Sequence, residues 1–299
     1  MSEISTITSV SKQYESSGDC STVSTGSGDL GGISYGSYQL SSNAGSVDSF
    51  LDFAQNYSND ALANYGRTLA QYEVNSQEFI NTWEEIGQSD PDGFGELQDA
   101  YAMEVYYNPS CIKLQANYYN VSTKSIAMKA CVFSRAIQYG SGNMVELFNN
   151  ACQRLGYDNL SYVDDARFDY NMIASVYDFL IDECDNSYQT SNGLYHSPND
   201  WCNGSWDVIC GLRNRFINEK SQLLNMLWFY IVIIGSFELP ISFLFDLRLE
   251  MWYNMYKDNN IWLHILVELN TLIVFLYFFV IVLLFEAHIN KSVLFEIIK

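Results

Sequence analysis

The chain has 299 residues, with 15 Lys and Arg against 35 Asp and Glu, which gives a formal net charge of −20. This length can bury a sizeable core, so a small disulfide-stapled scaffold is excluded. The acidic balance leaves no global electrostatic footprint for nucleic acid, and we expect no nucleic-acid partner. Residues 1–222 hold 11 basic and 28 acidic residues, whereas residues 223–299 hold only four and seven. We therefore predict two domains, 1–222 and 223–299.

The N-terminal stretch predicts a short helix followed by an unusual loop. Residues 4–15 are typical of a helix that ends before Gly18. Residues 16–43 have the Ser, Gly and Thr content of a linker, but acidic and aromatic residues lie among them. Closely spaced glycines permit tight turns, so we predict a folded loop that can hold a short hairpin. Residues 1–10 lack a basic start and an apolar run, and we expect no cleavable signal peptide.

From residue 46 onward, apolar residues recur every three or four positions, which predicts helices almost throughout. Breaks are predicted at Ser-Asp-Pro-Asp-Gly (89–93) and at Asn108–Pro109. The later helices are expected at 126–139, 144–155, 170–185 and 206–222. No stretch alternates strictly enough to demand a sheet. The predicted fold class is therefore mainly α, with the aromatic stripes in the core.

Cysteine and histidine give little sign of cross-links or metal sites. The seven cysteines are an odd number without C-x-x-C pairs, which favours free thiols. The one plausible local bridge joins Cys202 and Cys210, which flank a short loop. The three histidines are scattered, so we expect neither a metal nor another cofactor.

The tail contains two long apolar segments, 223–245 and 261–285. Each reaches the roughly 20 residues that a membrane-spanning helix needs, and aromatic residues lie near the segment ends. The sequence thus predicts a hydrophobic helical hairpin in contact with a lipid bilayer and a membrane-associated protein. The alternative is a hydrophobic hairpin buried within protein.

Two carboxylates in the first domain are candidates for chemistry. Glu15 lies at the end of the first predicted helix, and Asp29 lies in the glycine-rich loop fourteen residues later. Glycoside hydrolysis uses one carboxyl group that protonates the leaving oxygen and a second that activates water or attacks the sugar. The alternative is that Glu15 is a solvated helix-end residue and Asp29 a turn former.

The amino-acid sequence of this stretch resembles that of a known family. Residues 24–42 read STGSGDLGGISYGSYQLSS, similar to the chitosanase-like lysozyme domain of type VI secretion spike proteins and phage tail lysins. That domain is a relative of glycoside hydrolase family 46. The segments FSRAIQYG (133–140), YDFLIDE (177–183) and GLRNRF (211–216) resemble its later helices. The resemblance covers roughly residues 1–222 and implies a lysozyme-like, chitosanase-like helical domain with a glycine-rich active-site loop.

The resemblance also implies roles for individual residues. Glu15 is implied to be the general acid and Asp29 the general base of an inverting reaction, which needs a carboxyl separation of roughly 6.5–9.5 Å. Glu15 is expected to be buried against apolar groups. Four motif residues either line the sugar cleft or support the loop: Ser34, Tyr35, Tyr38 and Gln39. Arg135 and Gln138 are expected to brace the loop from the central helix.

The predicted function is a bacteriolytic glycosidase that cuts the glycan strand of peptidoglycan in the cell wall. Its delivery is expected through a phage tail or a secretion apparatus. One alternative is chitosan hydrolysis by the same mechanism, because the acidic first domain suits a polycationic substrate. The other is a holin-like, membrane-perturbing protein with an inactive soluble module.

Overall fold

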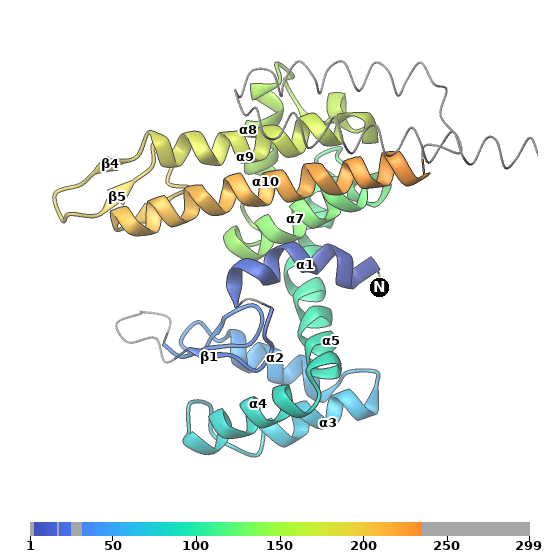
Figure 1. The fold of residues 1–299 in the computed structure, drawn as a ribbon, viewed down its shortest axis with the longest axis vertical. Helices are drawn as coiled ribbons and strands as arrows, with labels where there is room; N and C mark the ends of the chain where they lie inside the picture. Colours follow the sequence, from blue (N-terminus) through green and yellow to red (C-terminus); the bar gives the residue numbers. More distant parts are fainter. Residues whose placement is uncertain (1–2, 17, 25–31, 235–299) are drawn as a thin grey trace, which may run out of the picture. The chain divides into compact units, whose positions relative to one another are not determined.

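The computed structural model describes residues 3–16, 18–24 and 32–234, and its first compact unit extends to Ile233. The predicted mainly helical fold is confirmed (Figure 1). The α-helices run in chain order as α1 Glu3–Glu15, α2 Ser46–Gln55, α3 Asp60–Leu69, α4 Gln77–Ser89, α5 Pro91–Ala102, α6 Asn108–Ala116, α7 Ile126–Tyr139, α8 Met144–Arg154, α9 Asp169–Asp185 and α10 Trp206–Ile234. Short 3-10 turns occupy Val121–Thr123, Leu160–Val163 and Ala166–Phe168.

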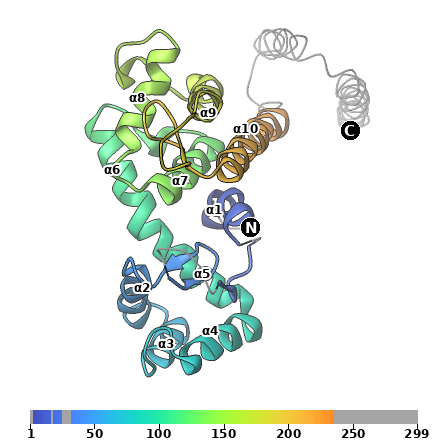
Figure 2. The same cartoon turned by 90° about the vertical axis from the view of Figure 1, so that its left-hand side faces the viewer.

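The helices form two groups joined by α5 and α6. Helices α2, α3 and α4 pack with α5, whereas α7, α8 and α9 pack on one another. Helix α1 lies against both α7 and α5 (Figures 1 and 2). The N-terminal helix therefore lies where the two groups meet, and its last residue is Glu15.

The two predicted breaks have different outcomes. Helix α4 ends at Ser89 and α5 begins at Pro91, as predicted. Asp90 between them accepts a hydrogen bond from the Gly93 N–H at 3.0 Å, and Pro91 needs no backbone partner at the first helical position. The break at Asn108–Pro109 is wrong, because a π-helical turn at Met103–Tyr107 leads directly into α6. The wider turn accommodates a proline that lacks an N–H to donate.

Two small antiparallel sheets interrupt the helices. The first joins β1 Val23–Ser24, β2 Ser34–Tyr35 and β3 Leu40–Ser41, with Val23 opposite Tyr35 and Tyr35 opposite Leu40. This sheet confirms the hairpin predicted for the glycine-rich loop. The second sheet was not predicted, and it joins β4 Tyr188–Gln189, β5 Tyr195–His196 and β6 Asn203–Gly204. Its strands of two residues are too short to leave an alternating pattern.

The core of the α2–α5 group is built around Trp83. Its ring lies 4.9–6.1 Å, between centroids, from four other buried rings: Tyr35, Phe50, Phe79 and Phe94. The Trp83 indole N–H donates to the Cys20 carbonyl at 3.0 Å. This packing attaches the glycine-rich loop to α4 and, through Trp83, to α2 and α5.

The predicted membrane tail is corrected by the structure. Among the described residues, no helix is long and apolar enough to cross a membrane. The start of the first expected span is the end of α10, where Leu223 and Leu227 are buried in protein on the same helix face as Phe216. The predicted membrane localisation and bilayer contact are therefore wrong by this finding. The rest of segment 223–245 and all of segment 261–285 lie outside the described residues, as does the expected hairpin.

The predicted domain boundary falls inside a helix. Helix α10 continues from Trp206 through residue 222 and ends at Ile234. Its middle carries charged side chains that pair with other helices. Four of its apolar residues belong to the core: Ile209, Phe216, Leu223 and Leu227. The boundary at 222/223 stays a prediction based on composition.

Gly36 permits the turn between β2 and β3. Its φ is +71°, and a Cβ there would lie 2.4 Å from Gln98 Oε1 and 2.9 Å from Trp83 Cζ2. Gln98 cannot easily move away, because it is buried and its Oε1 accepts from the Ser37 N–H at 2.8 Å. Both the backbone conformation and the packing therefore require glycine here.

We expect Gly36→Ala to destabilise the protein more than Gly45→Ala. Gly45 has a φ of +74° but open space at the Cβ position, so it isolates the backbone cost of about 1–2 kcal/mol. Gly36→Ala adds an overpacking cost of about 1–3 kcal/mol. Urea unfolding of both variants measures the difference, and equal losses would show that Gln98 and Trp83 yield freely.

Candidate active site

Glu15 lies at the C-terminal end of α1 and faces α10. One of its carboxylate oxygens is 2.7 Å from Arg215 Nη2, and the Glu15 side chain is 18% exposed. The expected apolar surroundings are thus replaced by a guanidinium. The Glu15 carboxylate is therefore partly buried but still accessible to solvent.

Arg215 connects Glu15 to a second carboxylate. Its Nε donates to Glu219 Oε1 at 2.7 Å, one helical turn further along α10. Its guanidinium also lies 5.6 Å from the centre of the Tyr14 ring. Because the planar guanidinium is held from several sides, it can fix the direction of the Glu15 carboxylate.

Glu219 is fully buried and receives donors from three helices. Its Oε2 accepts from Tyr177 Oη at 2.7 Å and from Ser134 Oγ at 3.0 Å, and it pairs with Arg135. Burial acts to raise the pKa of Glu219, but the charges of Arg135 and Arg215 outweigh it and hold that pKa below its ordinary value. The carboxylate is therefore ionised at neutral pH.

Together these groups form a charge network across four helices. Glu15 of α1 contacts Arg215 of α10, Arg215 contacts Glu219, and Glu219 contacts Arg135 of α7 and Tyr177 of α9. Positive and negative groups alternate along it, so each buried charge has an opposite neighbour. The network joins the end of α1 to the interior of the protein.

The described part of the glycine-rich loop is held by α1 and α5. Ser16 Oγ donates to the Ser37 carbonyl at 3.2 Å, and Gln98 Nε2 donates to the Cys20 carbonyl at 3.0 Å. Tyr38 Oη donates to Asp99 Oδ1 at 2.7 Å, and the other Asp99 oxygen is 2.9 Å from Lys12 Nζ. These bonds place both ends of the loop beside Glu15.

The four motif residues expected to line the cleft or to support the loop differ in how far they are buried. Tyr35 is fully buried between Phe79 and Trp83, and burial raises its pKa to about 12. Tyr38 is 6% exposed, so neither tyrosine offers a free ring face to a sugar. Ser34 and Gln39 are half-buried, and Gln39 Nε2 donates back to the Gly36 carbonyl at 3.1 Å. Asp29 lies outside the described residues.

Arg135 faces α10, and Gln138 contacts Arg135 on the same helix. Arg135 Nη1 donates to Gln138 Oε1 at 2.7 Å, and its Nη2 pairs with Glu219. The guanidinium also lies 4.9 Å from the Tyr177 ring centre and 5.1 Å from that of Phe216. Arg135 thus braces the helix that carries Arg215.

Sequence reasoning missed Glu219, Arg215 and Tyr177 as a connected group. The available signal was the i,i+4 spacing of Arg215 and Glu219 on α10. Glu219 also lies on the same helix face as Phe216 and Leu223, where an unpaired charge would be costly. A carboxylate at such a position predicts a buried cation on a neighbouring helix.

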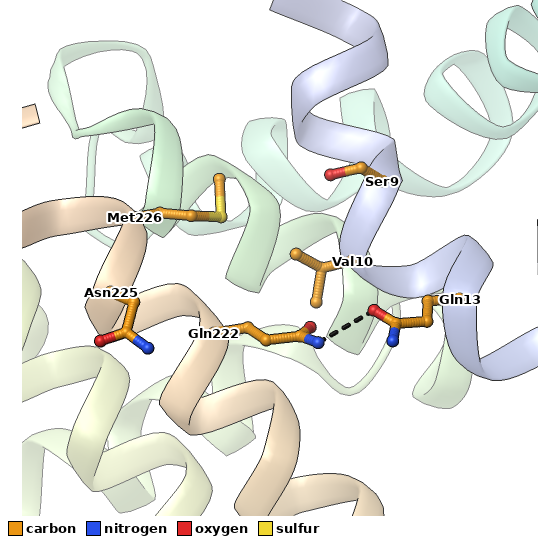
Figure 3. Close-up of a pocket in the computed structure, with 6 residues that line it drawn as sticks. All are labelled: Ser9, Val10, Gln13, Gln222, Asn225 and Met226. Carbon is orange, nitrogen blue, oxygen red and sulfur yellow. Dashed lines mark hydrogen bonds between the residues drawn. The ribbon is translucent and has the colours of Figure 1, made fainter. Parts of the chain in front are cut away.

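A separate groove of about 410 Å³ lies between α1 and α10. Figure 3 shows its lining residues, and a hydrogen bond of 2.9 Å joins Gln222 Nε2 to Gln13 Oε1 within it. Neither Glu15 nor Arg215 lines this groove: it is lined by Ser9, Val10, Gln13, Gln222, Asn225 and Met226. Over the described residues, no cluster of His, Cys, Asp or Glu is arranged to hold a metal ion.

Comparison with known proteins places the chain in a family. Residues 7–203 match the family described as type VI secretion system spike protein VgrG3-like, C-terminal. The chain belongs to this family, as the resemblance of the loop motif implied. It is 24% identical over 217 residues to the type VI secretion system spike protein VgrG3 of Vibrio cholerae serotype O1. The match covers 72% of this chain but 18% of that protein.

Two solved structures are similar in outline. Native chitosanase from Bacillus subtilis covers 80% of this chain and 90% of its own, with 14% identity and a TM-score of 0.45. A mutant of that chitosanase complexed with 6 GlcN gives the same score and identity and covers 92% of its own chain.

We expect Glu219→Gln to destabilise the fold by about 3–5 kcal/mol, because the buried Arg135 loses its charged partner. Asp178→Asn is the matched control, since Asp178 pairs with the neighbouring Lys220 at 2.7 Å but both side chains are partly exposed. That variant should lose about 1 kcal/mol or less. Denaturant unfolding at neutral pH measures both, and similar losses would contradict a special role for Glu219.

A comparison of wild type with Glu219→Gln also tests whether folding lowers the pKa of Glu219. Folding lowers the pKa of Glu219, so its carboxylate stabilises the native state above the unfolded value of about 4.3. That contribution is lost as the pH falls through the lower, folded value. The stability difference between wild type and Glu219→Gln should be constant near neutral pH and should narrow only below about pH 4.3.

Proposed function

We propose that this chain is a glycoside hydrolase that cleaves the glycan strand of peptidoglycan with inversion. Glu15 is the proposed general acid and Asp29 the proposed general base. The observation that carries this proposal is the placement of Glu15 at a helix end, partly exposed, directed by Arg215 and beside both ends of the loop that contains Asp29. Membership of the VgrG3-like family supports it.

The proposed reaction divides between the two carboxyl groups. Glu15 donates a proton to the glycosidic oxygen as the bond to the anomeric carbon breaks. Asp29 takes a proton from a water molecule that attacks the opposite face of the sugar. A water molecule fits between the two groups only if they are roughly 6.5–9.5 Å apart, and the product then has the inverted configuration.

Arg215 is proposed to position Glu15. It contacts both Glu15 and Glu219 at 2.7 Å. Because Glu219 competes for the same guanidinium, the attraction of Arg215 for the Glu15 carboxylate is weaker than in an isolated pair. Arg215 thereby holds the Glu15 carboxyl group in one direction.

The proposed setting is the bacterial cell wall, reached through a secretion apparatus. The curated relative is named as a spike protein of the type VI secretion system, and this chain corresponds to a small part of it. Chitosan is the second candidate substrate, because residues 1–222 hold 28 acidic and 11 basic residues and can attract a polycation.

Glu15→Gln should lower glycan cleavage by a factor of about 10² to 10⁴, because the amide preserves the shape but cannot donate the acidic proton. Glu3→Gln is the matched control, since Glu3 is an exposed glutamate at the other end of the same helix and pairs with Lys129. The full-length proteins are incubated with peptidoglycan and separately with chitosan, and new reducing ends are identified by mass spectrometry. Cleavage by Glu15→Gln at the wild-type rate would refute the assignment.

Asp29→Asn should cause a loss of similar size in kcat with little change in KM, because the base acts on water and not on the sugar. Asp19→Asn is its control: Asp19 is exposed near the start of the same loop and accepts from Ser21. NMR of the first product formed by wild type reports its anomeric configuration. Retention of configuration would exclude the inverting mechanism even if both carboxylates prove essential.

A further inference from the structure

Two thiols from different elements touch beneath the second sheet. Cys184 lies near the end of α9, and Cys202 lies directly before β6. Their sulfur atoms are 3.0 Å apart, and the residues are 2% and 1% exposed. Both are free thiols. The local bridge considered from the sequence is not the one that the fold favours, because Cys202 faces Cys184.

The backbone around Cys202 is held by groups other than sulfur. The Cys202 N–H donates to Ser197 Oγ at 3.0 Å, and the Cys202 carbonyl accepts from the Ser197 N–H at 2.9 Å. Glu183, next to Cys184, accepts from the backbone and side-chain N–H groups of Asn199 at 2.9 and 2.7 Å. The approach of the two thiols is thus set by the fold.

Aromatic packing holds the same loop against the helices. The Trp201 ring lies 5.0 Å from that of Tyr139 on α7 and 6.0 Å from that of Phe179 on α9. Cys202 therefore cannot move far from α9 without loss of buried contacts. Since a disulfide bond is roughly 2 Å long, a small rotation of the two side chains brings the sulfurs to bonding distance.

We propose that Cys184 and Cys202 are a disulfide-forming pair that fastens the β4–β6 sheet to α9. The oxidant is a low-molecular-weight disulfide, RSSR. The thiolate of one cysteine attacks RSSR and forms a mixed disulfide while one RS⁻ leaves. The thiolate of the other cysteine then attacks the protein sulfur of that mixed disulfide and releases the second RS⁻. The two protons lost by the cysteines end on two RSH, so the protein is oxidised and RSSR is reduced.

Burial of the two thiols makes disulfide formation slow. It also protects the disulfide bond, once formed, from reduction. The hydrogen bond with Cys184 and burial raise the pKa of the Cys202 thiol, which keeps the thiolate fraction small. Oxidation therefore requires transient opening of the sheet, whose Tyr188 and Leu194 are exposed. Once formed, the buried bond is shielded from external thiols. Such a bond persists in an oxidising compartment and stays reduced in a reducing one.

The test uses the full-length protein and needs no active enzyme. Folded wild type is equilibrated with oxidised glutathione, free thiols are alkylated, and peptides are mapped by mass spectrometry without reductant. We expect one linked pair of peptides, containing Cys184 and Cys202, with the loss of two hydrogen masses. The midpoint of thermal unfolding should rise by roughly 5–10 °C, because the bond closes a loop in the unfolded chain, and dithiothreitol should reverse the rise.

Variants separate this pair from the other thiols. Cys184→Ser and Cys202→Ser should each abolish both the link and the oxidant-dependent rise in melting temperature. Cys210→Ser is the control, because Cys210 is half-buried on α10 and should leave both unchanged. The wild-type measurement stands even if a serine variant does not fold.

Three results would overturn the inference: alkylation of both thiols in the oxidised folded protein, a link that joins Cys202 to Cys210, or a link between Cys184 and Cys202 that fails to raise the melting temperature. None of these readouts depends on glycan cleavage, so the inference stands or falls separately from the proposed function.

Discussion

The buried ion pair between Arg135 and Glu219 is the constraint on which the arrangement of the site depends. Both side chains are fully buried, and a charge in such surroundings is tolerated only when it is paired and hydrogen-bonded. Tyr177, Ser134 and Arg215 supply the remaining donors to Glu219, so α7, α9 and α10 must meet in one register. A shift of α10 by one residue would turn Glu219 away from Arg135 by about 100° and leave both charges unpaired. The register that satisfies this pair also presents Arg215 to Glu15, so a requirement of folding sets the direction of the proposed acid.

The sequence predicts the helices well and the network poorly, for a physical reason. Helix periodicity and end signals are local, and Asp90 shows this: one side chain and the following Pro91 suffice to end α4 and begin α5. Asn108–Pro109 carries the same kind of signal, but the π-helical turn at Met103–Tyr107 and the surrounding packing override it. The contact of Glu219 with Arg135 joins residues 84 positions apart and has no local signature beyond a charged residue on an apolar helix face.

The hydrophobic tail shows a related limit of composition. Residues 223–234 have the apolar content of a membrane helix, yet Leu223 and Leu227 are buried against the rest of the described protein. A helix that is apolar on one face and a helix that is apolar all round look alike over a few turns, and only the surroundings distinguish lipid from core. The charged residues that precede this stretch, Arg215, Glu219 and Lys220, all have protein partners on other helices. The start of the apolar run thus continues a protein-facing surface.

The glycine-rich motif contains residues that support the loop by packing and one residue, Asp29, that is proposed to be the general base. Tyr35 packs on Trp83 and Tyr38 is bonded to Asp99, so these two motif residues fit the supporting role that the sequence left open. Gly36 between them leaves space for Gln98. Close packing then explains the residue types at these positions, because the neighbouring side chains leave room for one shape and offer one hydrogen-bonding partner. Asp29, the proposed base, belongs to the part of the motif outside the described residues. Ser16 ties the described part of the loop directly to the helix end that holds Glu15. Packing therefore accounts for the described aromatic residues of the motif, whereas the role of Asp29 stays a proposal.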